Sequence, residues 1–200
     1  MRATTFFSAL LLGASALVLS PGPNGGPSVR DAHATVALLM STEELVAVSK
    51  HVLVGEPVER FSKWEKVGGS NRIVTYTRLV VSEGIVDAPE SESVWVRTLG
   101  GKVDKIGQSV AGEAEFKIGE PAVVFLASVD AGTLVVVGMA QGHFPIETKD
   151  GERVLRSSPD MGHLVRKKGD TRRSAREDLV GAKLDAARTR ILEARKAKTK

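Results

Sequence analysis

The hydrophobic residues of this 200-residue chain gather in short runs that are rich in valine. Two such runs, Ala122–Val129 and Leu134–Met139, are joined by Asp130-Ala131-Gly132. Short apolar runs bounded by Gly and Pro are typical of strands that are buried on both faces. We therefore predict a central β-hairpin whose most buried positions include Val124, Phe125, Leu126, Val135 and Val137.

Five further strands are expected around this hairpin. Arg72–Val81 alternates between two sets of side chains, as a strand does, and Gly68-Gly69-Ser70-Asn71 provides the turn before it. No helical segments alternate with these strands, whereas parallel strands need such crossover segments. The pattern predicts a mainly β fold, a small antiparallel barrel or sandwich, with strands at His51–Trp64, Arg72–Val81, Ser93–Leu99, His143–Thr148 and Glu152–Leu155.

Two capping boxes mark the beginnings of helices. Ser41 and Glu44 can each bind the other's backbone amide, and Ser174 and Glu177 can do the same. The first box predicts a short helix that ends by Lys50 and closes one end of the sheet. The second predicts a C-terminal helix with one apolar stripe, formed by Val180, Leu184, Ala187, Ile191 and Ala194.

The N-terminus has the pattern of a secretory signal. Arg2 precedes an apolar stretch, Phe6–Val18, which is short for a membrane span. Ala32 and Ala34 then place small residues as a signal peptidase site requires, which predicts cleavage after Ala34. We expect an exported protein, periplasmic or extracellular. The alternative is an uncleaved N-terminal anchor.

The polar segment Ser157–Arg173, with Pro159 and two glycines, has the composition of a linker. The sequence therefore predicts a signal peptide at 1–34, a short helix at 35–50, a β-barrel domain at 51–157, a linker at 158–173 and a separate basic C-terminal helix at 174–200.

Charge is distributed unevenly along the chain. Thr35–Val165 holds 13 Lys and Arg against 18 Asp and Glu, a net charge of −5, whereas Arg166–Lys200 holds 13 against 5, a net charge of +8. We expect this basic tail to be mobile, because its apolar stripe is narrow and exposed ion pairs contribute only about 0–1 kcal/mol each. Apart from simple solvation, the tail could dock its apolar stripe on the barrel, pair with another helix or lie on an anionic surface. If it has a function, we expect adhesion to an anionic envelope surface. Export makes nucleic acid a disfavoured partner. The expected adhesion residues are Arg172, Arg173, Arg176, Lys183, Arg188, Arg190, Arg195 and Lys196.

Motifs for catalysis and metal binding are missing from the sequence. There is no Cys, and His51, His143 and His163 do not stand in a metal-binding spacing. Neither a Gly-x-Ser-x-Gly elbow nor a phosphate-binding loop is present. We therefore predict no catalytic residues, no metal and no cofactor.

Three aromatic residues have two interpretations. Trp64, Tyr76 and Trp95 would form a binding platform if they were exposed on one sheet face, and part of the core if they were buried. Trp95 stands between two valines in a strand, which favours the core. Trp64 has charged neighbours, which favours partial exposure.

Several motifs together resemble a group of uncharacterised exported bacterial proteins over Ser41–Leu155. They are Leu53-Val54-Gly55, the Tyr-bearing strand Ile73–Val81, Val96–Gly101, Phe116–Glu120 with Val124-Phe125-Leu126, and Gly138–Phe144. More loosely, their order is similar to the barrel of netrin-module domains and tissue inhibitors of metalloproteinases. The resemblance implies an OB-like barrel. The inhibitory site of that family uses an N-terminal Cys, which this chain lacks, so that mechanism is not carried over.

These observations favour an exported, non-enzymatic binding module that recognises a protein or an envelope partner. The alternatives are a small secreted hydrolase with a dispersed active site and an envelope-associated structural protein. A cluster of carboxylates or histidines in a cleft would favour the hydrolase.

Overall fold

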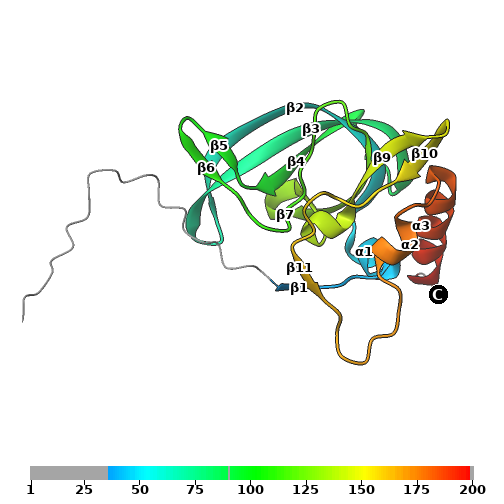
Figure 1. Cartoon of the computed structure of the whole chain (residues 1–200). Helices are drawn as coiled ribbons and strands as arrows, with labels where there is room; N and C mark the ends of the chain where they lie inside the picture. Colours follow the sequence, from blue (N-terminus) through cyan, green and yellow to red (C-terminus); the bar gives the residue numbers. More distant parts are fainter. Residues whose placement is uncertain (1–35, 90, 199–200) are drawn as a thin grey trace, which may run out of the picture. The chain divides into compact units, whose positions relative to one another are not determined.

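In the computed structural model, which describes residues 36–89 and 91–198, the valine-rich run lies at the centre of a large, mostly antiparallel sheet (Figure 1). It forms β7 (Ala122–Val129) and β8 (Thr133–Val136), joined by the 3-10 turn η1 (Asp130–Gly132). The prediction of a mainly β fold with this central hairpin is confirmed. The predicted leader and the Ala32–Ala34 motif lie outside the described residues.

The sheet has the strand order β10-β9-β7-β2-β3-β4-β8, and β7 also pairs with β8. Its pairs are antiparallel except β4 with β8, where Val96 lies opposite Leu134 and Arg97 opposite Val135. The 3-10 turn η2 (Met139–Gly142) leads from β8 into β9. The remaining bounds are β2 (His51–Val67), β3 (Ser70–Val86), β4 (Ser93–Leu99), β9 (His143–Lys149) and β10 (Glu152–Leu155).

The β2–β3 hairpin is the longest element of the sheet, and its register shifts at Gly55. A Cβ atom at Gly55 would lie 3.0 Å from Leu53 Cδ1 and 3.2 Å from Leu79 Cβ. Glycine is therefore needed there because the chain bends where neighbouring side chains approach the backbone.

Strand β7 is buried on both faces because it separates two apolar cores. Val123 and Phe125 face a core shared with the helices, whereas Val124 and Leu126 face a second core between the strands. Burial of Val124, Phe125 and Leu126 confirms the prediction, and Val137 is also buried. Val135 is only half-buried, which corrects the prediction, because it pairs beside Arg97 on the outer side of the strands.

Helix α1 (Thr42–Val48) begins at the predicted capping box and buries Leu45 and Val46. The second capping box begins α2 (Ala175–Leu179), but the predicted single C-terminal helix is divided in two. Gly181 interrupts it with a φ of +81°, and its N–H donates to the Leu155 carbonyl of β10. The chain then continues as α3 (Leu184–Lys198).

The C-terminal helices pack against the sheet domain, beside α1 and β10 (Figure 1). Leu179, Ala187 and Ile191 are fully buried in the same core as Phe125. The expectation of a mobile, weakly docked tail is therefore corrected. The stripe is narrow, but α1, β3 and β10 lie against α3 and cover it, and α2 adds its own buried residues.

The segment expected to be a linker contributes a strand. β11 (His163–Val165) pairs in parallel with β1 (Val36–Leu38) in a separate two-stranded sheet. A second small sheet, the hairpin of β5 (Gly101–Val103) and β6 (Ile106–Gln108), packs on β2 and β3.

Candidate functional site

The candidate site is the outer side of β2, β3 and β4. Because successive side chains of a strand point to opposite faces, residues opposite one another in register share a face. Phe61, Tyr76 and Arg97 form one such row, and Glu59, Arg78 and Trp95 form the next. Their sequence neighbours point to the other side, toward the core between the strands.

Three aromatic rings meet on this side. The Phe61 ring is stacked on Tyr76 with centroids 5.5 Å apart, and the Trp95 ring meets Phe61 edge-on at 5.4 Å. Phe61 is 47% exposed and Trp95 39%, while Tyr76 is half-buried. We call Phe61, Tyr76 and Trp95 the aromatic face. Ring pairs at these distances stabilise one another, so the aromatic face is a rigid surface.

Glu65 connects the aromatic face to two cations. Its carboxylate accepts hydrogen bonds from the Tyr76 hydroxyl at 2.9 Å and from Arg97 Nη1 at 2.7 Å, and Lys63 Nζ lies 3.1 Å away. Lys63 Nζ also lies 4.8 Å from the centre of the Tyr76 ring. Although burial raises the pKa of Glu65, the hydrogen bonds from Lys63, Tyr76 and Arg97 together hold it below its usual value. Glu65 is therefore charged at neutral pH and fixes the Tyr76 hydroxyl.

A second ion pair borders the aromatic face, with Arg78 Nε 3.0 Å from Glu59. The site thus combines exposed aromatic rings with arginines that are held by carboxylates. Trp, Tyr and Arg are the residues that contribute most to binding energy at protein interfaces, where rings fill pockets and charged groups surround them. The arrangement suits molecular recognition.

The sequence located this face only in part. Trp95 was predicted in the core, and this is wrong: Val94 and Val96 point inward, so the ring between them must point outward. Trp64 is partly exposed as predicted, at 48%, but it lies an odd number of residues from Phe61 and so belongs to the other side of β2. Phe61 was missed. The signal that could have found it is cross-strand register, which local patterns do not give.

The eight basic residues of the predicted adhesion surface do not come together at one place. Arg172 binds Asp170 and Glu44 of α1, and Arg173 donates to the Glu177 carbonyl. Arg176 and Lys196 are exposed on the helices. The other four pair with carboxylates on neighbouring elements: Lys183 with Glu152, Arg188 with Glu83, Arg190 with Asp178 and Arg195 with Asp87.

The three described histidines lie on different strands. His51 begins β2, His163 is exposed on β11, and His143 is buried on β9, where its Nδ1 is 3.1 Å from Ser158 Oγ. In residues 36–89 and 91–198, no group of three or more His, Asp or Glu side chains is arranged to hold a metal ion. Within the same range, no helix has both the length and the hydrophobicity of a membrane span.

Comparisons of the chain with models of protein families, with curated proteins and with solved structures found no match. What this face can bind therefore follows from its own residues.

Proposed function

We propose that this protein is an exported, non-enzymatic binding module that docks a protein partner on the aromatic face. The observation that carries the proposal is the cluster of three touching rings on β2, β3 and β4, of which Phe61 and Trp95 are well exposed. Single exposed apolar residues are common on proteins, whereas a contiguous aromatic group between ion pairs is a feature of interaction sites.

The scaffold we propose is an OB-like barrel. The pairing of β7 with both β2 and β8, together with the parallel β4–β8 pair, supports a closed ring in the order β2-β3-β4-β8-β7. In an OB barrel, the face of the second and third strands and the loop between the last two bind ligands. In this chain those strands are β3 and β4, which carry Tyr76 and Trp95, and the loop holds Asp130. Asp130 Oδ2 lies 3.9 Å from Arg97.

A protein partner suits this face better than a uniformly anionic surface. Arg97 and Lys63 share the carboxylate of Glu65, and Arg78 is paired with Glu59. With Asp130 beside Arg97, three carboxylates accompany these three cations, so the charges are locally balanced. Balanced charges around aromatic rings give orientation and specificity, whereas attraction to an anionic polymer would need an excess of free cations.

Export is part of this proposal and is supported by Phe6–Val18 and the Ala32–Ala34 motif. Mass spectrometry of the chain recovered from outside the cytoplasm should find Thr35 as its first residue. Recovery of only the full-length chain, in the cytoplasm, would contradict export.

Docking can be tested by comparing variants as bait in an extract of the cell envelope. Trp95→Ala and Phe61→Ala should each reduce capture of the partner at least about tenfold, the effect expected for aromatic residues at the centre of an interface. Trp64→Ala is the matched control, because Trp64 has a similar exposure on the other side of β2 and should leave capture unchanged. Equal capture by all three variants would overturn the proposed docking face.

A further inference from the structure

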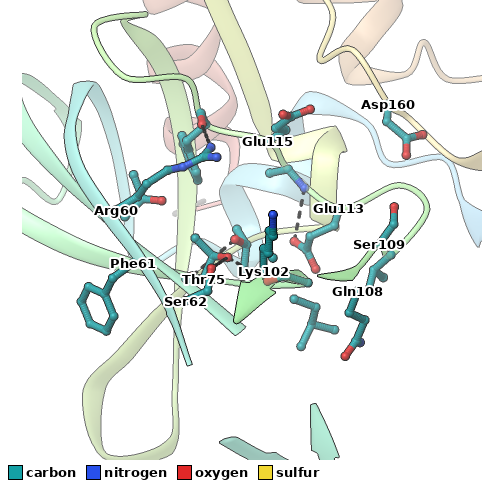
Figure 2. A pocket seen from close by; sticks show the side chains of 18 residues that line it. Arg60, Phe61, Ser62, Thr75, Lys102, Gln108, Ser109, Glu113, Glu115 and Asp160 are labelled. Atoms are coloured by element: carbon teal, nitrogen blue, oxygen red, sulfur yellow. Dashed lines mark hydrogen bonds between the residues drawn. The ribbon is translucent and has the colours of Figure 1, made fainter. Parts of the chain in front are cut away.

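A cavity of about 590 Å³ lies on the opposite side of the same three strands, beneath the β5–β6 hairpin and the loop that follows it. Figure 2 shows Ser62 and Thr75 on the strand side of this cavity and Gln108 and Glu113 on the loop side, whereas the Phe61 ring is turned away. The volume falls within the range of small-molecule sites, about 300–1,000 Å³.

The inward sides of β2, β3 and β4 form the floor of the cavity. Along these strands the inward side chains change from apolar residues to residues with hydroxyl groups. Next to the apolar core, Leu79 pairs with Val94. Two residues away from this core, Thr77 lies opposite Val96. After two more residues, Thr75 lies opposite Thr98 on one side and Ser62 on the other. Inward positions normally continue an apolar core, so hydroxyls at four of them favour a polar ligand.

Most of these hydroxyls have protein partners that fix their orientation. Ser62 and Thr75 lie 2.9 Å apart, and the Thr75 hydroxyl donates to the Gly100 carbonyl at 2.8 Å. Thr98 is bonded more weakly, 3.4 Å from the Thr75 carbonyl. A hydroxyl that donates to the protein keeps lone pairs with which it can accept from a ligand.

Thr77 is different. It lines the cavity and is only 1% exposed, and the hydrogen bonds that orient Ser62, Thr75 and Thr98 do not involve its hydroxyl. As a residue that lines the cavity, Thr77 can use its hydroxyl both to donate to and to accept from a ligand. The cavity therefore contains a polar group that a ligand can bind.

The walls add neutral and charged polar groups. Gln108 Oε1 accepts from the Ile73 N–H, which leaves the amide NH₂ to donate. Glu113 accepts from the Ala114 N–H at 3.3 Å, and burial raises the pKa of its carboxyl. Both signs of charge occur at the exposed rim, on Lys102 and Glu115, so neither a cation nor an anion is favoured there.

The β5–β6 hairpin forms the roof of the cavity, and glycines at its start allow it to approach the strands of the floor closely. Gly101 has a φ of +130°, and a Cβ atom there would lie 2.3 Å from Thr75 Oγ1 and 2.4 Å from Ser62 Oγ. The Gly100 N–H donates to the Ile73 carbonyl at 2.8 Å. The site is thus preorganised, which reduces the entropic cost of binding.

We propose that this cavity binds a small, neutral, polyhydroxylated ligand, namely a mono- or disaccharide, through the hydroxyls of Ser62, Thr75, Thr77 and Thr98 and the carboxyl of Glu113. Each hydroxyl of such a ligand both donates and accepts, as do the hydroxyls of the floor. This site goes beyond the proposed protein docking, because it lies on the other side of the strands from the aromatic face.

The experiment titrates the isotope-labelled chain with glucose, N-acetylglucosamine and trehalose at millimolar concentrations and follows backbone amide NMR shifts. At least one of these sugars should shift the amides of residues 75–77, 98–101 and 108–114. Thr77→Val should weaken that binding about tenfold by removing one hydrogen bond. Thr148→Val, at an exposed position of β9, is the matched control and should bind as the natural chain does.

Glu113→Gln is a second variant, which changes the wall of the cavity and not its floor, and it should also weaken binding. Thermal melting of every variant shows that it is folded. The proposal is overturned if none of the three sugars shifts these amides, if the shifts lie elsewhere, or if folded Thr77→Val and Glu113→Gln bind as tightly as the natural chain. Protein capture by the aromatic face is measured separately, so failure of one proposal leaves the other standing.

Discussion

Lowering the pH below 6.5 should destabilise this protein through His143. The His143 side chain is only 3% exposed, with its Nδ1 3.1 Å from Ser158 Oγ and its ring 4.7 Å from that of Phe116. Burial lowers the pKa of His143 from 6.5 to about 4, because the charged imidazolium is poorly solvated there.

The direction and size of the effect follow from linkage. Between pH 6.5 and 4 the unfolded chain protonates this histidine while the folded chain leaves it neutral, so protons favour the unfolded state and stability falls as the pH falls. The free energy of unfolding should drop by about 2 kcal/mol between pH 7 and 5, and by about 3 kcal/mol by pH 4. For a chain of this size, about 2 kcal/mol corresponds to a lower Tm by about 4–8 °C.

Other shifted groups act in a different pH range or in the opposite direction. The pKa values of Glu44, Glu65 and Glu177 are lowered, so the stability that they contribute is present above the ordinary value of 4.5 and is lost below it. Glu113 has a raised pKa, and its contribution falls as the pH rises above 4.5, which partly offsets the effect of His143. The range from pH 7 to 5 therefore isolates the histidine best, and Glu113→Gln removes the opposing group.

The assay is urea unfolding at pH 7, 6 and 5 for the natural chain, His143→Gln and His163→Gln. His143→Gln should be less stable at pH 7 but should lose most of the pH dependence. His163 is exposed on β11, and its variant should keep that dependence. A natural chain with equal stability at pH 7 and 5, or a pH slope that survives in His143→Gln, would refute the reasoning.

Three further predictions concern the cores and the roof of the cavity. Phe125→Ala should cost about 3–5 kcal/mol in urea unfolding, because its fully buried ring leaves a cavity, and a change below about 1 kcal/mol would contradict that burial. Ile191→Ala should cost about 2–5 kcal/mol, while exposed Lys196→Ala should stay within about 0.5 kcal/mol, and equal values would mean that α3 does not contribute to the core. Gly101→Ala should cost more than about 1 kcal/mol because of its positive φ, and its amide spectrum should change around Ser62 and Thr75, whereas an unchanged spectrum would contradict the close approach.

The strands could be predicted from the sequence because the pattern that defines them is local. The bounds predicted for Ala122–Val129, Ser93–Leu99 and Glu152–Leu155 agree with β7, β4 and β10. Which of the two sets of side chains on a strand points to the core, and which to solvent, could not be predicted in the same way. Trp95 was assigned to the core from its valine neighbours, although alternation within β4 makes those valines the reason for its exposure.

The C-terminal helices show a second limit of sequence patterns. Composition indicated a strongly basic tail, and composition contains no information on where the compensating carboxylates lie. Glu152 of β10 pairs with Lys183, just before α3, whereas Glu83 on β3 and Asp87 directly after it pair with Arg188 and Arg195 of α3. The stripe through Ile191 also looks narrow in isolation. Its burial depends on a surface formed by α1, β3 and β10, which are distant in sequence.

The alternation of side chains along β2, β3 and β4 places the aromatic face on one side of these strands and the cavity on the other. Alternation along β3 points Tyr76 outward while Thr75 and Thr77, its neighbours on each side, point into the cavity. A ligand that binds the Thr77 hydroxyl therefore holds the backbone beside Tyr76 without occupying the aromatic face. The two sites share a rigid sheet but no volume, so a sugar and a protein partner are not expected to compete for space. A substitution on one side leaves the chemistry of the other intact, which is why Trp95→Ala and Thr77→Val can separate the two activities.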